Sequence, residues 1–156
     1  PRELLDQLIQ RESGFAREAG VELSVSVRSD RPLMNRVANI ALLILENLVR
    51  NAVQAAPAGG CVRLSADESP QAVEFRVCDN GTGIPDAVRR RIFTPVVTTK
   101  EGGTGLGLAL SQQLARSLGA DLELIGTGPG GTEFLLRLPK PLAGGAVPAV
   151  SQALGG

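Results

Sequence analysis

The chain has 156 residues, 43% of them hydrophobic, and its 16 basic residues balance 16 acidic ones. This composition supports one domain with a real core and excludes a disordered chain. Zero net charge provides no broad field for nucleic acid or a membrane surface. The sequence has no histidine, which excludes histidine metal sites, Ser-His-Asp triads and imidazole acid–base chemistry.

The first half of the chain predicts a helix, a strand, a long helix and a hairpin. Residues 1–20 read as an amphipathic helix ending at a glycine. Strict alternation places Val21, Leu23, Val25 and Val27 on one face of a half-buried strand. Residues 31–57 predict a long helix stopped by a proline, and residues 61–79 a β-hairpin turning at 68–70.

The second half predicts two helices and a second hairpin. Residues 86–93 predict a short basic helix, residues 94–105 an irregular loop, and residues 121–139 the hairpin. Between them, residues 106–119 predict a helix with Leu106, Leu110, Leu114 and Leu118 in register. The Ala-, Gly- and Pro-rich residues 141–156 predict a disordered tail. This order predicts an α+β two-layer sandwich, with helices covering one face of a mixed, largely antiparallel sheet.

Two cysteines, Cys61 and Cys78, fall in predicted strands. Without a secretory leader, they indicate reduced core residues of a cytosolic protein, and a disulfide is the alternative. The longest apolar run, "IALLIL" at 40–45, is too short to cross a bilayer. Because the first residue is proline, we interpret the chain as an excised fragment.

The stretch "TTKEGGTGLGLAL" at 98–110 places four glycines where a leucine-patterned helix begins. Each glycine inside a helix costs about 1 kcal/mol relative to alanine. Glycines let backbone N–H groups approach a phosphate, and a helix start adds unpaired N–H groups, so we favour an anion cradle. The alternative is a flexible loop with an N-cap at Thr104. Lys100 would meet a terminal phosphate, or else be an ordinary solvated lysine.

The stretch "VCDNGTGIP" places a carboxylate on a buried face. Asp79 shares parity with Val73, Phe75 and Val77, and a buried charge is costly unless donors satisfy it. An adenine amino group is such a donor, and the following glycines would admit a flat ligand. The alternative is an ordinary Asx turn.

The stretch "ENLVRNAVQ" places Asn47 and Asn51 on one face of a helix that is otherwise apolar nearly all round. Asn51 could give a hard oxygen to Mg²⁺, which keeps waters and bridges phosphates. The alternative is mutual hydrogen bonding of the two amides in the core. Glu46 and Arg50 have the spacing of a surface ion pair.

In this order, the pieces resemble the catalytic and ATP-binding domain of bacterial sensor histidine kinases, in the group that includes gyrase, mismatch-repair ATPases and large heat-shock chaperones. "ILENLVRNAVQAA" resembles the N box, "CDNGTGIP" the G1 box, "IFTPVVTTK" the F box and "GGTGLGLAL" the G2 box. "GTGPGGTEFLLRLP" resembles the last glycine box and its closing strand. Five weak motifs in sequence are specific.

The resemblance implies a Bergerat-type ATP-binding domain over residues 21–140, with residues 1–20 a helical linker or the end of a dimerisation domain. Asp79 would bind the adenine amino group, Asn51 would coordinate Mg²⁺, and Phe93 would tether a mobile lid at 94–105. The catalytic residues implied are Asn47 and Lys100. The other nucleotide-binding residues implied are Gly81, Gly83, Thr99, Gly103, Thr104, Gly105, Leu106, Gly107 and Thr132.

Hydrolysing members of this group resemble each other in a glutamate four residues before the metal asparagine. Here that position is Asn47, and an amide is a poor general base. The implied function is therefore transfer of the ATP γ-phosphoryl group to a histidine on a separate dimerisation domain, with a response regulator downstream. A chain without histidine would not autophosphorylate alone.

Three rival functions stay open at the level of the sequence: an ATP-hydrolysing gyrase- or chaperone-like module, an anti-sigma-type serine kinase, and a module that binds ATP without chemistry. We expect ATP and Mg²⁺ as ligands, no nucleic acid and no direct membrane contact. The expected location is cytoplasmic, with the parent protein either soluble or membrane-tethered.

Overall fold

The computed structural model describes residues 1–95 and 106–140. Its helices and strands, in chain order, are α1 (Arg2–Glu18), β1 (Glu22–Val27), α2 (Asn35–Ala55), β2 (Cys61–Glu68), β3 (Ala72–Asp79), α3 (Asp86–Arg89), α4 (Gly107–Ser117), β4 (Asp121–Gly128) and β5 (Gly131–Pro139). The predicted tail at 141–156 lies outside the described residues.

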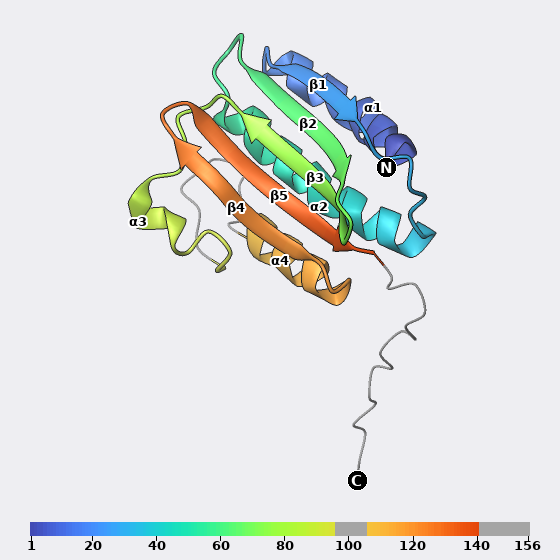
Figure 1. The fold of residues 1–156 in the computed structure, drawn as a ribbon. Helices are drawn as coiled ribbons and strands as arrows, with labels where there is room; N and C mark the ends of the chain where they lie inside the picture. Colours follow the sequence, from blue (N-terminus) through green and yellow to red (C-terminus); the bar gives the residue numbers. More distant parts are fainter. Residues whose placement is uncertain (96–105, 141–156) are drawn as a thin grey trace.

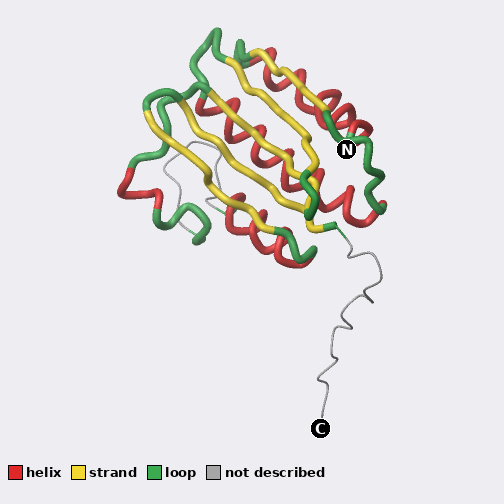
Figure 2. The backbone as a smooth tube through the Cα atoms, in the orientation of Figure 1, coloured by secondary structure: helices red, strands yellow, loops and turns green. Residues whose placement is uncertain are grey.

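The strands form one sheet in the order β1-β2-β3-β5-β4. β1 pairs with β2 in parallel through the crossover helix α2, and the other three pairs are antiparallel. Helices α1, α2 and α4 lie on one face of this sheet, and α3 lies beyond one end (Figure 1; Figure 2). The predicted α+β sandwich is therefore confirmed.

The core lies between the sheet and the helices. Helix α2 supplies an almost continuous buried face that includes Leu45, Leu48 and Val49, because its apolar residues recur at helical spacing. Strand β3 meets this face with the fully buried Phe75. In the described residues, none of the helices has the length and apolar character needed to cross a membrane.

Helix α1 packs into the same core through Leu4, Leu5, Leu8 and Ala16. It also contacts both α2 and β1. Helix α1 therefore packs against the same core as the sheet, and the boundary at residue 20 between a linker or dimerisation domain and the ATP-binding domain stays a prediction.

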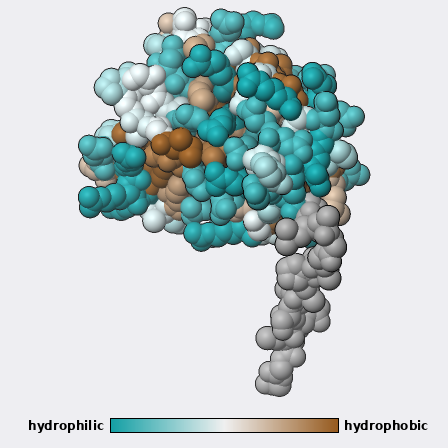
Figure 3. Space-filling view, viewed as in Figure 1, coloured by the Kyte–Doolittle hydropathy of each residue, from teal (hydrophilic) through white to brown (hydrophobic). Residues whose placement is uncertain are grey.

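The sheet face turned away from the helices is largely hydrophilic (Figure 3). Arg76 of β3 there bonds Glu133 of the neighbouring strand β5 at 2.9 Å and Glu74 of its own strand at 3.1 Å. Cys78 points to this face, is free and is half-buried, and burial raises the pKa of its thiol. Cys61 is also free and half-buried, so the predicted disulfide alternative is not observed.

Three local predictions differ from the structure. The long helix begins at Asn35 rather than at residue 31, and the short basic helix covers only Asp86–Arg89. In β1, Val25 is 38% exposed, because an edge strand has a neighbour on one side only. The alternation along the strand predicted which sheet face Val25 lies on, but not how much of its side chain is buried.

The leucine face predicted for α4 is wrong at its first turns. Leu106 is 50% and Leu110 is 55% exposed. The helix instead buries Ala109, Ser111 and Ala115. Small residues let α4 approach α2 closely, so the face in contact with the core carries little side-chain volume.

Candidate nucleotide-binding site

One face of α2 forms a wall of the candidate site. Asn47, Asn51 and Ala55 follow one another at four-residue spacing, so they lie in a line about 12 Å long. A Cβ on Gly107, the first residue of α4, would lie 2.5 Å from Asn47 Oδ1. A Cβ on Gly81 would lie 2.3 Å from the carbonyl oxygen of Ala55. Asn51 is therefore half-buried between the start of α4 and the loop after β3.

The side chain of Asn47 is held by α4. Its Nδ2 donates to Ser111 Oγ at 2.9 Å, and Ser111 is only 2% exposed. The predicted alternative, in which Asn47 and Asn51 bond each other, is thus not observed for Asn47. Since Asn47 contacts the first turn of α4, it fixes the position of a helix start that the sequence predicts to bind phosphate.

Asp79 ends strand β3 and is half-buried. Its Oδ1 accepts a 2.8 Å hydrogen bond from the backbone N–H of Gly81, which is the Asx turn that the sequence left as an alternative. In register across the sheet, Asp79 faces Thr132 of β5, which is 7% exposed. The structure therefore brings an acid and a hydroxyl together at the end of the sheet, and the turn orients the acid.

At two glycines of the loop after Asp79, the backbone packs so closely against neighbouring backbone that no side chain would fit. Besides Gly81, which touches Ala55, Gly83 has φ +81° and a Cβ there would lie 2.3 Å from the carbonyl oxygen of Gly128. The loop is thus clamped between the end of α2 and the β4–β5 turn. This fixes where a ligand could meet its backbone.

Phe93 is half-buried and packs edge-on against Phe134, with ring centroids 6.3 Å apart and planes at 75°. Phe134 lies two residues after Thr132 on β5, so Phe93 anchors the chain just before residue 96 to the core behind the site. The predicted residues Thr99, Lys100, Gly103, Thr104 and Gly105 lie outside the described residues, as do most of the predicted lid and any cap at Thr104.

The predicted Glu46–Arg50 ion pair is wrong, because both residues pair with α1 instead. Arg50 Nε bonds Glu12 Oε2 at 2.9 Å, and the hydrogen bonds to Glu12 raise the pKa of Arg50. Glu46 Oε1 bonds Arg11 Nη1 at 2.6 Å. The carboxylate of Glu46 therefore lies on the α1 side of the helix.

The described residues fit a magnesium ion held partly by the nucleotide. They contain no cluster of three or more His, Cys, Asp or Glu side chains that could hold a metal alone. Mg²⁺ commonly takes one or two protein oxygens and completes its shell with phosphates and water. The amide of Asn51 suits such a role, and within the described part of the chain its side chain makes no hydrogen bond to protein.

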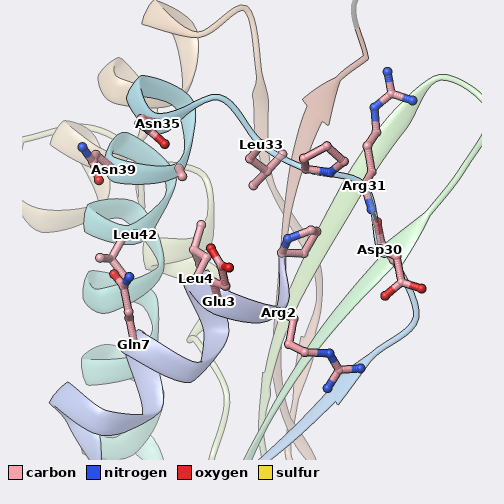
Figure 4. Close-up of a pocket in the computed structure, with 14 residues that line it drawn as sticks. Arg2, Glu3, Leu4, Gln7, Asp30, Arg31, Leu33, Asn35, Asn39 and Leu42 are labelled. Atoms are coloured by element: carbon pink, nitrogen blue, oxygen red, sulfur yellow. Dashed lines mark hydrogen bonds between the residues drawn. The ribbon is translucent and has the colours of Figure 1, made fainter.

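Two hollows flank the fold. One, of about 420 Å³, lies between the loop after β3 and the β4–β5 turn, and includes Gly83 and Thr127. The other, of about 400 Å³, lies between the starts of α1 and α2, where Arg2, Arg31, Asn35 and Asn39 surround it (Figure 4). Asn39 precedes Asn51 by 12 residues, or about 18 Å along α2. The second hollow is therefore separate from the candidate site.

Sequence reasoning missed two residues of the site, Ser111 and Thr127. Thr127 contacts both Thr132 and the loop after Asp79. The signal for Thr127 was present, since two threonines flank the turn of a predicted hairpin at positions that pair across it. Ser111 carried no such signal, because its partner is on a helix more than 60 residues away.

A two-layer sandwich with an oriented acid at the end of its sheet, beside a helix that carries two amides, fits a nucleotide-binding domain. The chain belongs to the family of histidine kinase-, DNA gyrase B- and HSP90-like ATPases, whose model matches residues 37–142. It is 36% identical over 159 residues to the sensor protein TorS of Escherichia coli (strain K12), covering 99% of this chain and 17% of that protein.

Solved structures have a similar fold. The full-length ShkA structure in complex with AMPPNP has a TM-score of 0.77 and 33% identity, covering 88% of this chain and 29% of that one. The catalytic domain of histidine kinase ThkA has a TM-score of 0.78 and 24% identity, covering 89% and 91%. The chain therefore spans less than a third of TorS and of ShkA but nearly all of the ThkA catalytic domain.

Proposed function

We propose that this chain binds ATP with Mg²⁺ and transfers the γ-phosphoryl group to a histidine on a separate dimerisation domain, from which a response regulator receives it. The observation that carries the proposal is the arrangement of Asp79 and Thr132 in register at the sheet end, where Gly81 of the following loop packs against Ala55 on the Asn47–Asn51 face of α2. Family membership and the AMPPNP complex of ShkA support an adenine nucleotide as the ligand.

Each residue has a distinct role in this proposal. The carboxylate of Asp79 accepts a hydrogen bond from the adenine amino group, and Asn51 holds Mg²⁺, which neutralises charge on the phosphates. Gly107 offers backbone approach at the start of α4, and Lys100 meets the terminal phosphate. Phosphoryl transfer needs mainly positioning and charge neutralisation, which these groups supply.

The position of Glu46 disfavours the hydrolytic alternative. A hydrolase needs a base that activates water, and an amide at position 47 is a poor one. The nearest carboxylate in sequence, Glu46, bonds Arg11 on the α1 side of the helix. We therefore expect slow phosphate release by the chain alone, measured with Mg-ATP, and steady turnover would favour the hydrolase.

The site is tested by Asp79→Asn. The amide keeps the size of the side chain but loses a charged acceptor, so we expect about tenfold or greater loss of ADP affinity by titration calorimetry, because hydrogen bonds to charged groups contribute about 1.5–3 kcal/mol. Asp121→Asn, an exposed acid at the far end of β4, is the control. Equal ADP affinity for both variants would contradict the assignment.

The reaction is tested by reconstitution with a dimerisation domain that bears a histidine. With Mg-ATP we expect acid-labile phosphoprotein on that added domain only, because this chain has no histidine. Acid-stable phosphoserine on a partner would instead indicate the serine-kinase alternative. Tight ATP binding without any transfer would leave a nucleotide-sensing module.

A further inference from the structure

Three polar side chains form a row across three adjacent strands. Asp79 of β3 is in register with Thr132 of β5, and Thr132 is in register with Thr127 of β4. Residues directly opposite each other on paired strands project to the same face of a sheet. Asp79 follows the buried Val77 with strand parity, so the row lies on the face that the helices cover.

Thr127 connects this row to the loop that follows Asp79. Its Oγ1 accepts a 2.6 Å hydrogen bond from the backbone N–H of Ile84, and lies 3.0 Å from Thr132 Oγ1. The loop also touches the strand end through the backbone, because Gly83 packs against Gly128. Thr127 is therefore bonded to both the loop and the hydroxyl beside Asp79.

The bond from Ile84 limits how the hydroxyl of Thr127 can meet Thr132. A threonine hydroxyl has one proton to donate and two lone pairs. The bond from Ile84 occupies one of these lone pairs, so Thr127 meets Thr132 with one proton and one lone pair, and either oxygen can be the donor. A Thr132 that accepts this bond keeps its own proton, which it can donate to a third group in the site.

We propose that Thr127 is a positioning residue that sets base specificity, by holding Thr132 as a hydrogen-bond donor beside the acceptor Asp79. This inference rests on the proposed nucleotide site. An acceptor next to a donor matches adenine, whose amino group donates and whose neighbouring ring nitrogen accepts. Hypoxanthine presents the reverse pattern, a carbonyl oxygen next to a ring N–H, so the same row disfavours it.

The test compares ADP with inosine diphosphate on four proteins by titration calorimetry. These are the wild type, Thr127→Val, Thr127→Ser and the control Thr82→Val, which removes an exposed hydroxyl from the same loop. Valine keeps the shape and removes the hydroxyl, so we expect ADP affinity to fall about fivefold to tenfold. The preference for ADP over inosine diphosphate should shrink, because Thr132 is then free to accept.

Thr127→Ser restores the hydroxyl and should recover both the affinity and the preference, and Thr82→Val should match the wild type. Wild-type ADP affinity in Thr127→Val, or equal losses for both nucleotides, would overturn the inference. So would a serine variant as weak as the valine variant. If Thr127→Val does not fold by circular dichroism, Thr127→Ala against Thr127→Ser makes the same comparison.

Failure of the wild type to bind ADP would be a different result. It would refute the proposed function itself, whereas normal wild-type binding with an indifferent Thr127 refutes only the role of Thr127.

Discussion

Replacing Arg50 with methionine should destabilise the fold by about 3 kcal/mol or more at neutral pH, because it leaves a buried carboxylate without its partner. Glu12 is only 1% exposed, and Arg50 bonds it through Nε at 2.9 and 3.1 Å and through Nη2 at 3.0 Å. Methionine keeps the length of the side chain but supplies none of these donors.

Removing the other partner should cost less. In Glu12→Gln the guanidinium that loses its carboxylate has a side chain 60% exposed, so water replaces much of the lost interaction. We expect about 1–2 kcal/mol, near the lower end of the range for one hydrogen bond to a charged group. The asymmetry follows from burial alone, since both variants break the same ion pair.

Urea unfolding followed by circular dichroism would measure both variants. Glu46→Gln is the matched control, because it breaks the other α1–α2 pair, whose Arg11 side chain is 54% exposed. This control should cost at most about 1 kcal/mol. At total stabilities of about 5–15 kcal/mol, the differences are measurable. Equal losses for Arg50→Met and Glu12→Gln would refute the argument from burial.

Two further predictions concern the strand ends. Gly131→Ala should unfold or strongly destabilise the domain in a thermal melt, because Gly131 has φ +124° and a Cβ there would lie 1.8 Å from the carbonyl oxygen of Asp79. The control Gly130→Ala, whose Cβ would point into open space, should not. Lys140 hydrogen-bonds Glu68 and lowers the pKa of the Glu68 carboxyl below 4.5. The contribution of this pair to stability is therefore present above pH 4.5 and is lost as the pH falls through the lowered pKa. The stability advantage of the wild type over Lys140→Met in urea melts should therefore shrink in strong acid to the part that the Lys140 hydrogen bond to the Ser69 carbonyl provides, and a constant difference would contradict this.

The sequence predicted the sheet well because its signals are local. Alternation along 61–79 marks the β2–β3 hairpin, and the buried parity of Val73, Phe75 and Val77 placed Asp79 correctly at the end of β3. The pairing of Asp79 with Thr132 depends instead on β5 lying next to β3, which is a property of the sheet order and not of either segment.

Contacts between side chains of different helices could not be predicted from residue spacing within one helix. The four-residue spacing of Glu46 and Arg50 considers only their own helix, whereas α1 offered each a partner of opposite charge. Leucine spacing likewise assigned α4 a face that includes Leu110, but close contact with α2 at Asn47 selects small residues there instead.

The strand order has a consequence for synthesis of the chain. Among the described residues β5 is the last strand in chain order, yet it lies inside the sheet, where it separates β3 from β4. A nascent polypeptide that has emerged only as far as residue 130 holds β4 without a partner and β3 with an open edge. The ribosome must therefore release the chain through β5 before Asp79 acquires its neighbour, and a premature stop before residue 131 removes the site together with the fold.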